Sequence, residues 1–165
     1  MPTVRIRDAE LGDARHVADI WLKANVSRRG RFDAPANIDL IIERRMRSGD
    51  SLFFVAEEAE HIVGIGSQVP ARENDGTGPI ITGLMHLSMI AVDPAHWGKG
   101  IGKALTVYGV RRAASLGCES IQLWTLLSKE RAQRFYTSMG FKETGREKTD
   151  ERGERIRLYA LRLKN

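Results

Sequence analysis

Glycine and lysine gather where a strand-like run of this chain meets a helix-like run. Residues 92–105 read VDPAHWGKGIGKAL, and glycine recurs at every second position from 98 to 102. Glycine lets the backbone take positive φ and approach a ligand closely. Free N–H groups at a helix start attract anions, phosphate above all. We therefore predict a diphosphate cradle made by the N–H groups of residues 98–103, with charge added by Lys99 or Lys103; the alternative is a turn that needs glycine for steric reasons alone.

Nucleotide-binding loops fit this spacing poorly. A Walker-type loop requires G-x-x-x-x-G-K-[ST], but Gly102 and Lys103 are followed by Ala104, and position 97 is tryptophan. No hydroxyl is offered to magnesium, which disfavours nucleotide hydrolysis. A dinucleotide fold requires G-x-G-x-x-G and an acidic residue at the end of the next strand. Here the spacing is G-x-G-x-G, and Glu119 stands before the next predicted strand.

Helix and strand patterns alternate on both sides of this loop. A helix from about Asp13 is predicted by apolar residues at i, i+3, i+4 and i+7: Val17, Ile20, Trp21 and Ala24. The other helices are predicted after residue 37, from the glycine segment to Gly117, and over residues 129–139. The strands are predicted at residues 3–7, 51–58, 61–70, 80–92, 120–127, 141–148 and 155–163. These elements predict an α/β fold with a mixed, mostly antiparallel sheet of about six to seven strands flanked by about four helices.

Local signals set the ends of these elements. Helix ends are expected at Gly49, Gly117 and Gly140. Ser128 is expected to cap the start of the last helix. Residues 72–79 are expected to form a loop because they combine Gly, Asn, Asp and Pro. The 13-residue strand is long, so we expect a bulge at Gly83 or at residues 88–90.

Length and composition indicate a single globular domain over residues 1–165. No apolar run is long enough to span a membrane, and the first residues carry no apolar signal segment, so we expect neither membrane insertion nor secretion. The one cysteine, Cys118, excludes an internal disulfide and a multi-cysteine zinc site. A cytoplasmic location follows as the expectation. Cys118 has no histidine partner in the pattern and is interpreted as a buried structural thiol.

The net charge of +5 is spread among acidic residues, and no aromatic residues interleave with the basic runs. We therefore expect no nucleic-acid partner. Nucleic-acid binding is the third functional hypothesis, and it rests on charge alone. Arg28, Arg29 and Arg31 form one basic run. They are interpreted either as a solvated loop or as a site favouring a carboxylate-bearing amine, such as an amino acid or an acidic peptide.

The segment IAVDPAHWGKGIGKAL resembles the acyl-CoA loop of the GNAT superfamily of N-acetyltransferases, whose pattern is Arg/Gln-x-x-Gly-x-Gly/Ala after a Val-Asp-Pro. The segment ERAQRFYTSMGFKETGR is similar to the family's C-terminal motif N-x-x-A-x-x-F-Y-x-x-x-G-F. The matching residues there are Ala132, Phe135, Tyr136, Gly140 and Phe141. The opening segment and the hairpin FVAEEAEHIVGIG also resemble family members. The chain departs from the pattern at Trp97, in place of Arg or Gln, and at Lys129, in place of Asn.

This resemblance implies acetyl transfer from acetyl-CoA to a primary amine, by direct attack on the thioester and without a metal. The backbone of Ile90, Ala91 and Val92 would pair with the pantetheine arm as an added strand does. The implied cofactor-binding residues are Ile90, Ala91, Val92, Trp97, Gly98, Lys99, Gly100, Ile101, Gly102, Lys103, Lys129, Phe135 and Tyr136. The resemblance puts the side-chain contacts of Trp97 and Lys129 in question.

Three catalytic roles follow from the implied chemistry. The N–H of Ile90 is the candidate oxyanion donor. Tyr136 is the candidate acid for the leaving thiolate, because a phenol of pKa about 10 stays protonated when a thiol of pKa about 8.5 leaves; the alternative is a packing role. His86, which shares a strand face with Ser88, is the candidate base. A water chain to His86, a base at Glu57 or Glu58, or a structural histidine at this position are the alternatives.

The acceptor amine cannot be read from the sequence. The three remaining histidines are expected at the surface: His16, His61 and His96. A non-catalytic acyl-CoA-binding sensor or regulatory domain of the same fold is the competing function. The sequence also leaves open whether the chain forms a homodimer.

Overall fold

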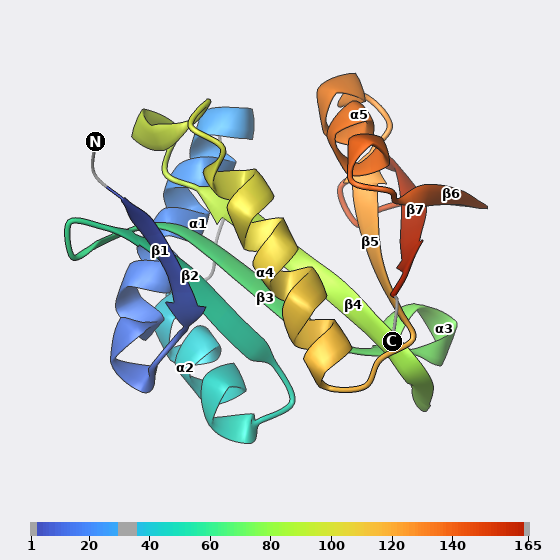
Figure 1. Ribbon diagram of the computed structural model, residues 1–165, viewed down its shortest axis with the longest axis horizontal. Helices are drawn as coiled ribbons and strands as arrows, with labels where there is room; N and C mark the ends of the chain where they lie inside the picture. Colours follow the sequence, from blue (N-terminus) through green and yellow to red (C-terminus); the bar gives the residue numbers. More distant parts are fainter. Residues whose placement is uncertain (1–2, 30–35, 164–165) are drawn as a thin grey trace. The chain divides into compact units, whose positions relative to one another are not determined.

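The computed structural model of the chain describes residues 3–29 and 36–163. The strands are β1 Val4–Asp8, β2 Leu52–Glu58, β3 His61–Arg72, β4 Ile80–Val92, β5 Ser120–Leu126, β6 Lys142–Thr149 and β7 Arg155–Arg162. The helices are α1 Ala14–Arg29, α2 Ile38–Ser48, α3 Glu73–Gly76, α4 Ile101–Ser115 and α5 Glu130–Ser138, with 3-10 turns η1 Leu11–Asp13 and η2 Pro94–His96. Figure 1 shows these elements along the chain.

Hydrogen bonds order the strands β1-β2-β3-β4-β5-β7-β6 in a seven-stranded sheet. The pairs β1–β2, β2–β3, β5–β7 and β6–β7 are antiparallel, whereas β4 and β5 pair in parallel. The predicted fold class, a mixed and mostly antiparallel sheet with helices, is confirmed.

The chain groups into two compact units, and β4 and α4 run from one into the other. The first unit comprises the described parts of Met1–Val69 together with Met89–Arg111. The second comprises Pro70–Ser88 and the described part of Arg112–Asn165.

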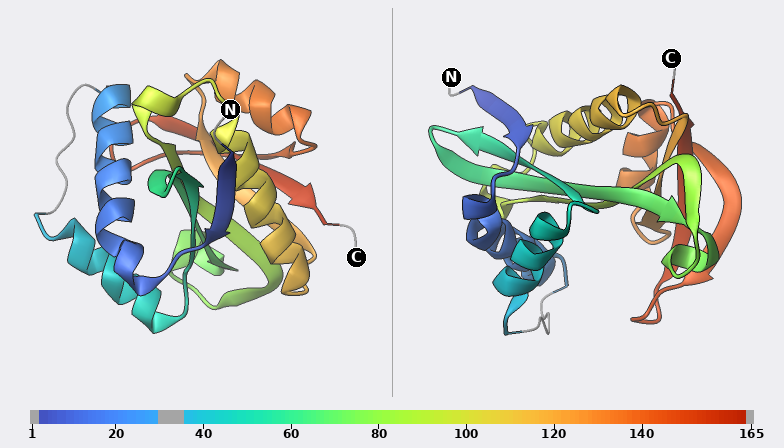
Figure 2. Two further views of the ribbon diagram at one scale, coloured as in Figure 1. Left: turned by 60° about the vertical axis from the view of Figure 1, so that its left-hand side comes forward. Right: turned by 90° about the horizontal axis from the view of Figure 1, so that it is seen from below.

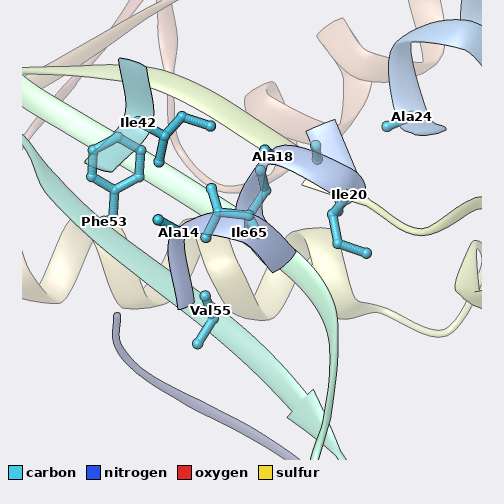
Figure 3. Packing of buried hydrophobic residues seen from close by; sticks show 10 residues of the cluster. Ala14, Ala18, Ile20, Ala24, Ile42, Phe53, Val55 and Ile65 are labelled. Atoms are coloured by element: carbon cyan, nitrogen blue, oxygen red, sulfur yellow. The ribbon is translucent and has the colours of Figure 1, made fainter. Parts of the chain in front are cut away.

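The core of the first unit lies between α1, α2 and one face of its strands, as the right-hand view of Figure 2 and the close view in Figure 3 show. Its buried members are Ala14, Val17, Ala18, Ile20, Ala24, Ile42, Phe53, Val55, Ile65 and Ala91. The predicted apolar stripe of α1 supplies several of them, because residues three and four apart share one face of a helix. Helix α4 lies on the other side of these strands.

Gly64 in β3 lets α4 pack closely against the sheet. A Cβ atom at this position would lie 2.9 Å from Leu105 Cδ1 and 3.0 Å from Ile101 Cγ2. Both of those side chains are buried, so neither can move aside without displacing its neighbours. Since α4 carries the candidate phosphate loop at its start, Gly64 also fixes where that loop stands.

We expect Gly64→Ala to lower the free energy of unfolding by about 1–3 kcal/mol, the usual cost of overpacking a core. Urea unfolding followed by circular dichroism measures it. Gly12→Ala is the matched control, because a Cβ atom there meets nothing within 4 Å, and it should change stability by less than about 0.5 kcal/mol. Equal effects of the two substitutions would contradict this packing account.

The sheet of the second unit joins residues 84–86 of β4 to β5, and then β5 to β7 and β6. The parallel pairing matches Leu84 with Ser120 and His86 with Gln122. The final hairpin around residues 150–154 is confirmed, and it carries a register shift between Glu143 and Glu147. Gly83 has φ +80° and its carbonyl accepts a hydrogen bond from Glu119 N–H at 2.7 Å. Gly83 thus departs from extended backbone in the long strand β4, while the bulge expected at Gly83 or at residues 88–90 remains a prediction.

Two helix ends follow the predicted glycines in detail. At the end of α4, Cys118 N–H donates to Ala113 O at 3.1 Å and Gly117 N–H to Ala114 O at 3.0 Å. This is a Schellman cap, in which the glycine takes positive φ, here +83°. Cys118 is half-buried, and burial raises the pKa of its thiol, which favours the inert protonated form and agrees with a structural role.

The end of α5 has the same cap. Phe141 N–H donates to Tyr136 O at 3.1 Å, and Gly140 N–H donates to Thr137 O at 3.0 Å. The rings of Phe141 and Tyr136 contact each other with centroids 5.7 Å apart, which supplies the apolar contact that accompanies this cap.

Two local predictions are wrong. Lys129, not Ser128, is the N-cap of α5, and no side chain caps it. Ser128 lies instead in a turn closed by Lys129 N–H to Leu126 O at 3.1 Å. Within the predicted loop 72–79 the short turn α3 forms, because Asn74 and Asp75 take left-handed φ values of 52° and 53°, a conformation that these residues tolerate.

Candidate functional site

The loop between β4 and α4 is fastened where the strand ends. Asp93 N–H donates to Val63 O at 2.8 Å, and the Asp93 carboxylate accepts from Ala95 N–H at 3.0 Å. His96 N–H donates to Asp93 O at 2.8 Å and closes the turn η2. The Val-Asp-Pro segment therefore forms a compact corner that holds the start of the glycine run.

The glycine run leaves its backbone open. Gly98 has φ +81° and Gly100 has φ +80°. A Cβ atom built at either position meets nothing within 4 Å, so the space beside both residues is free of protein atoms. Positive φ and this open approach are the two conditions for which glycine is needed.

Helix α4 begins directly after this run. Its first helical hydrogen bond runs from Ala104 N–H to Gly100 O at 3.0 Å. The N–H groups of Gly100, Ile101, Gly102 and Lys103 precede that bond and have no acceptor within the helix. Helix α4 has 15 residues, and its dipole adds positive potential at this end. These donors and the open space are what a bound diphosphate would need; the binding itself remains a prediction.

Trp97 closes the loop with its side chain. The indole Nε1–H donates to the carbonyl oxygen of Val92 at 2.8 Å, while the side chain stays 45% exposed. An arginine or glutamine at this position would offer a different set of donors. In this chain the residue ties the loop back to the end of β4.

The remaining side chains of the loop point to different surroundings. Ile101 is buried and packs at Gly64, so only its backbone is available to a ligand. Lys99 is exposed, with Nζ 3.5 Å from His96 Nδ1. Lys103 and Gly100 line a groove of about 500 Å³. The other residues of this groove are Ile6, Ala104, Val107, Tyr108 and Arg111.

The end of β4 offers backbone rather than side chains. Ala91 and Val92 are buried, and Ile90 is half-buried. These three residues lie in the first unit with the glycine loop. Their predicted roles, strand-like pairing and an oxyanion donor at Ile90, remain predictions.

His86 lies in the second unit on the half-buried face of β4. Its neighbours Met85 and Leu87 are each 5% exposed and point to the opposite face. Gln122 Nε2 lies 3.4 Å from His86 Nδ1. The donor and acceptor roles in this contact depend on the tautomer of the ring. Burial, and secondarily the charge of Lys148, lower the pKa of His86 below its usual 6.5.

Tyr136 also lies in the second unit, on α5. Its ring contacts Phe135 at a centroid distance of 5.0 Å, in addition to Phe141. Phe135 and Tyr136 are half-buried, and Lys129 is exposed at the helix start. The two packing contacts fix the ring of Tyr136, while the acid role remains a prediction.

Comparison with known proteins shows which family this chain belongs to. Residues 15–141 match the family model described as the Acetyltransferase (GNAT) family. The chain belongs to the GNAT acetyltransferase family. A mycothiol acetyltransferase of Acidothermus cellulolyticus is 30% identical over 147 residues, which are 82% of this chain and 44% of that protein. The chain therefore spans less than half of this curated relative.

Solved structures of GNAT proteins share the fold. An N-acetyltransferase from Staphylococcus aureus Mu50 superimposes with a TM-score of 0.79 at 19% identity, over 98% of this chain and 99% of that chain. A GNAT family acetyltransferase from Brucella melitensis in complex with acetyl-CoA superimposes with a TM-score of 0.71 at 20% identity, over 100% and 91% of the two chains.

Other carboxylates and histidines of this GNAT chain are engaged in pairs. Glu57 contacts Arg7 at 2.7 Å, and Glu58 contacts His96 Nδ1 at 3.0 Å. The pKa of Arg7 is raised by hydrogen bonds from its side chain to Asp13 and Glu57. His16 and His61 are exposed, as expected, and His96 is half-buried with its side chain 24% exposed. Glu57 and Glu58, the alternative bases, are already engaged in these contacts.

Two further polar contacts of the GNAT chain were not predicted, because no sequence pattern indicates them. Gln133 Nε2 donates to the carbonyl oxygens of Leu126 and Leu127, at 3.0 and 2.8 Å. It thereby joins α5 to the end of β5. Lys148 and Arg146 of β6 lie over the ring of Trp124, at 4.6 and 5.6 Å from its centroid.

Some predictions concern parts or properties that stay untested. Arg31 lies outside the described residues, as do the side chains of Arg28 and Arg29. Within residues 3–29 and 36–163, no cluster of three or more His, Cys, Asp or Glu side chains is arranged to hold a metal ion. No helix in the same ranges is long and apolar enough to cross a bilayer. The single domain, the cytoplasmic location and a homodimer remain predictions.

Proposed function

We propose that the chain transfers the acetyl group of acetyl-CoA to a primary amine. The observation that carries this proposal is the start of α4. There, Gly98 and Gly100 have positive φ and open space beside them, directly before N–H groups that lack helical acceptors. Membership of the GNAT family and a GNAT structure solved with acetyl-CoA support acetyl-CoA as the co-substrate.

The proposed reaction uses three groups of the chain. His86 takes a proton from the acceptor ammonium, which leaves a nucleophilic amine. The amine nitrogen bonds to the thioester carbonyl carbon while the Ile90 N–H stabilises the oxyanion. The C–S bond then breaks, and Tyr136 gives its proton to the departing thiolate. The nitrogen then loses its second proton, which returns the phenolate to the phenol, and His86 releases its proton to water. The products are the N-acetylated amine and free coenzyme A.

The low pKa of His86 gives the proposed base a testable pH signature. The active form is the neutral ring, and a pKa below 6.5 keeps it neutral at physiological pH. Because His86 takes the proton from the bound ammonium, the reactive pair is the neutral ring with the protonated amine, whose pKa is about 10. We therefore expect log kcat/KM to be level at neutral pH and to fall with a slope of one as pH drops through the lowered pKa of His86, below 6.5.

His86→Gln tests whether this pH dependence comes from His86. The variant should be slower, and its log kcat/KM should rise with a slope of one from the acidic range through neutral pH, because without the base only the neutral fraction of the amine reacts. The initial rate of thiol release, measured between pH 5 and pH 9 in steps of about half a unit, gives the profile. A wild-type profile with a slope of one over the whole range, or a level profile at neutral pH in the variant, contradicts His86 as the base.

Amine-dependent thiol release separates the two candidate functions. An enzyme releases one free thiol for each acetylated amine, and mass spectrometry identifies the product. A non-catalytic sensor binds acetyl-CoA and releases no thiol with any amine. A panel of amino acids, peptide N-termini, polyamines and aminoglycosides covers the main acceptor classes.

A further inference from the structure

A cluster of charged and aromatic side chains in the second unit lies beside His86. Lys148 Nζ is 4.6 Å and Arg146 Cζ is 5.6 Å from the ring centroid of Trp124. Asp75 reaches the same cations, at 2.8 Å from Arg146 and 3.7 Å from Lys148. We call Asp75, Trp124, Arg146 and Lys148 the Trp124 cluster. The cluster carries one positive charge in excess.

The strand register puts this cluster and His86 on one face of the sheet. His86 pairs with Gln122 in parallel register, and Trp124 is two residues further along β5, so it shares that face. Lys148 pairs with Ile156 of β7, and Leu158, two residues on, pairs with Trp124.

The acidic residues of β6 are held on the opposite face. Arg157 contacts Glu143 at 2.7 Å and Glu147 at 3.1 Å. Arg157 pairs with Thr125, the neighbour of Trp124, so its side chain points the other way. The hairpin thus places Lys148 and Arg146 on the face of His86 and Trp124, while Glu143, Glu147 and Arg157 lie on the opposite face.

The cations of the cluster remain open to exchange. The side chains of Arg146, Lys148 and Asp75 are 59%, 35% and 40% exposed. Ion pairs at such exposed positions contribute little to stability, so a ligand carboxylate can join or replace Asp75 at low cost. Arginine suits this task because its planar fork binds a carboxylate through two hydrogen bonds. Trp124 holds both cations in place through its ring face.

We propose that the acceptor carries a carboxylate near its amine, and that Arg146 and Lys148, seated on Trp124, bind this carboxylate while His86 faces the amine. The proposal presupposes the acetyl transfer proposed above. The acceptor class is then the amino acids and short acidic peptides. Polyamines are disfavoured, because each further ammonium group is repelled by the excess positive charge.

Matched acceptors test this directly. The pairs are L-phenylalanine with L-phenylalaninamide and L-methionine with L-methioninamide, with spermidine as the polycation. An amide lowers the pKa of the neighbouring amine, so intrinsic reactivity favours the amides. We nevertheless expect kcat/KM to be at least about tenfold higher for the free acids, because a hydrogen bond between charged groups contributes enough binding free energy for such a factor. The preference should shrink as salt screens it.

Arg146→Gln and Lys148→Gln locate the effect. Each should raise KM for the free acids about tenfold, with kcat and the amide kinetics nearly unchanged. Arg155→Gln is the matched control, because it removes one charge from the same hairpin. Arg155 contacts Glu147 at 3.5 Å and pairs with Thr149, so it lies on the face opposite Lys148.

The outcomes separate this proposal from the proposed function. Acetylation of acids and amides alike, or a preference for spermidine, overturns the carboxylate site and leaves the acetyltransferase standing. An acid preference that survives in both glutamine variants also overturns it. If no acceptor is turned over, calorimetric titration of L-phenylalanine and its amide in the presence of coenzyme A decides: tighter binding of the acid supports the site, and equal binding overturns it. Absence of both thiol release and acetyl-CoA binding ends both proposals.

Discussion

Gly100→Glu is expected to abolish the stabilisation of the protein by acetyl-CoA. At a ligand concentration of about 100 times the Kd, binding adds about 2.7 kcal/mol, which raises Tm by about 5–10 °C for a chain of this size. The substituted carboxylate would occupy the open space beside Gly100 and repel the diphosphate. The backbone φ of +80° also strains any residue with a Cβ atom. We therefore expect no measurable shift of Tm in the variant.

Gly153→Glu is the matched control for this loss. Gly153 has φ +82°, and a Cβ atom there also meets nothing within 4 Å. It lies in the turn between β6 and β7. Both variants should lose similar stability without ligand, about 1–2 kcal/mol from the left-handed conformation, but only Gly153→Glu should keep the acetyl-CoA shift. Equal shifts in the two variants would show that the diphosphate binds elsewhere.

Tyr136→Phe is expected to lower kcat by about 100- to 10,000-fold, the usual contribution of a general acid. The affinity for acetyl-CoA should stay within about twofold of the wild-type value, because the ring contacts to Phe135 and Phe141 are kept. Stopped-assay thiol release gives kcat, and calorimetry gives the Kd for acetyl-CoA. A loss confined to kcat also argues against the sensor hypothesis, since a sensor has no turnover to lose.

Tyr159→Phe controls for the removal of a phenol from the same unit. Tyr159 is buried, and its hydroxyl lies 3.5 Å from Gln133 and from Glu143. Its substitution should reduce stability slightly and leave kcat within about threefold, because its hydroxyl is assigned no proton transfer. Equal kcat values for Tyr136→Phe and wild type would assign Tyr136 to packing alone.

The elements of this fold are largely predictable because their signals are local. The stripe of α1, the caps at Gly117 and Gly140, and the final hairpin depend on residues within a few positions of one another. The cap of α5 was missed because a hydroxyl at Ser128 suits an N-cap in isolation. The turn that follows β5 instead delays the helix to Lys129, an outcome set by the strand rather than by the cap residue.

The site is predictable only in its backbone part. The glycine spacing indicates an anion cradle, and the loop has the open geometry that this requires. Side-chain contacts between distant positions leave no such trace. The indole of Trp97 on Val92 O and the cations over Trp124 depend on how strands and loops meet. The partner of His96 was missed for the same reason, because Glu58 lies 38 residues earlier in the chain.

The most direct test of whether residues 98–103 hold the diphosphate is a titration of ¹⁵N-labelled protein with acetyl-CoA. The backbone amide signals of glycine report the binding. The signals of Gly98, Gly100 and Gly102 are expected to move together and to saturate at one equivalent. Those of Gly12 and Gly153 should stay in place. Saturable binding that leaves the three loop signals unmoved, or no binding at millimolar acetyl-CoA, would contradict a diphosphate site at residues 98–103.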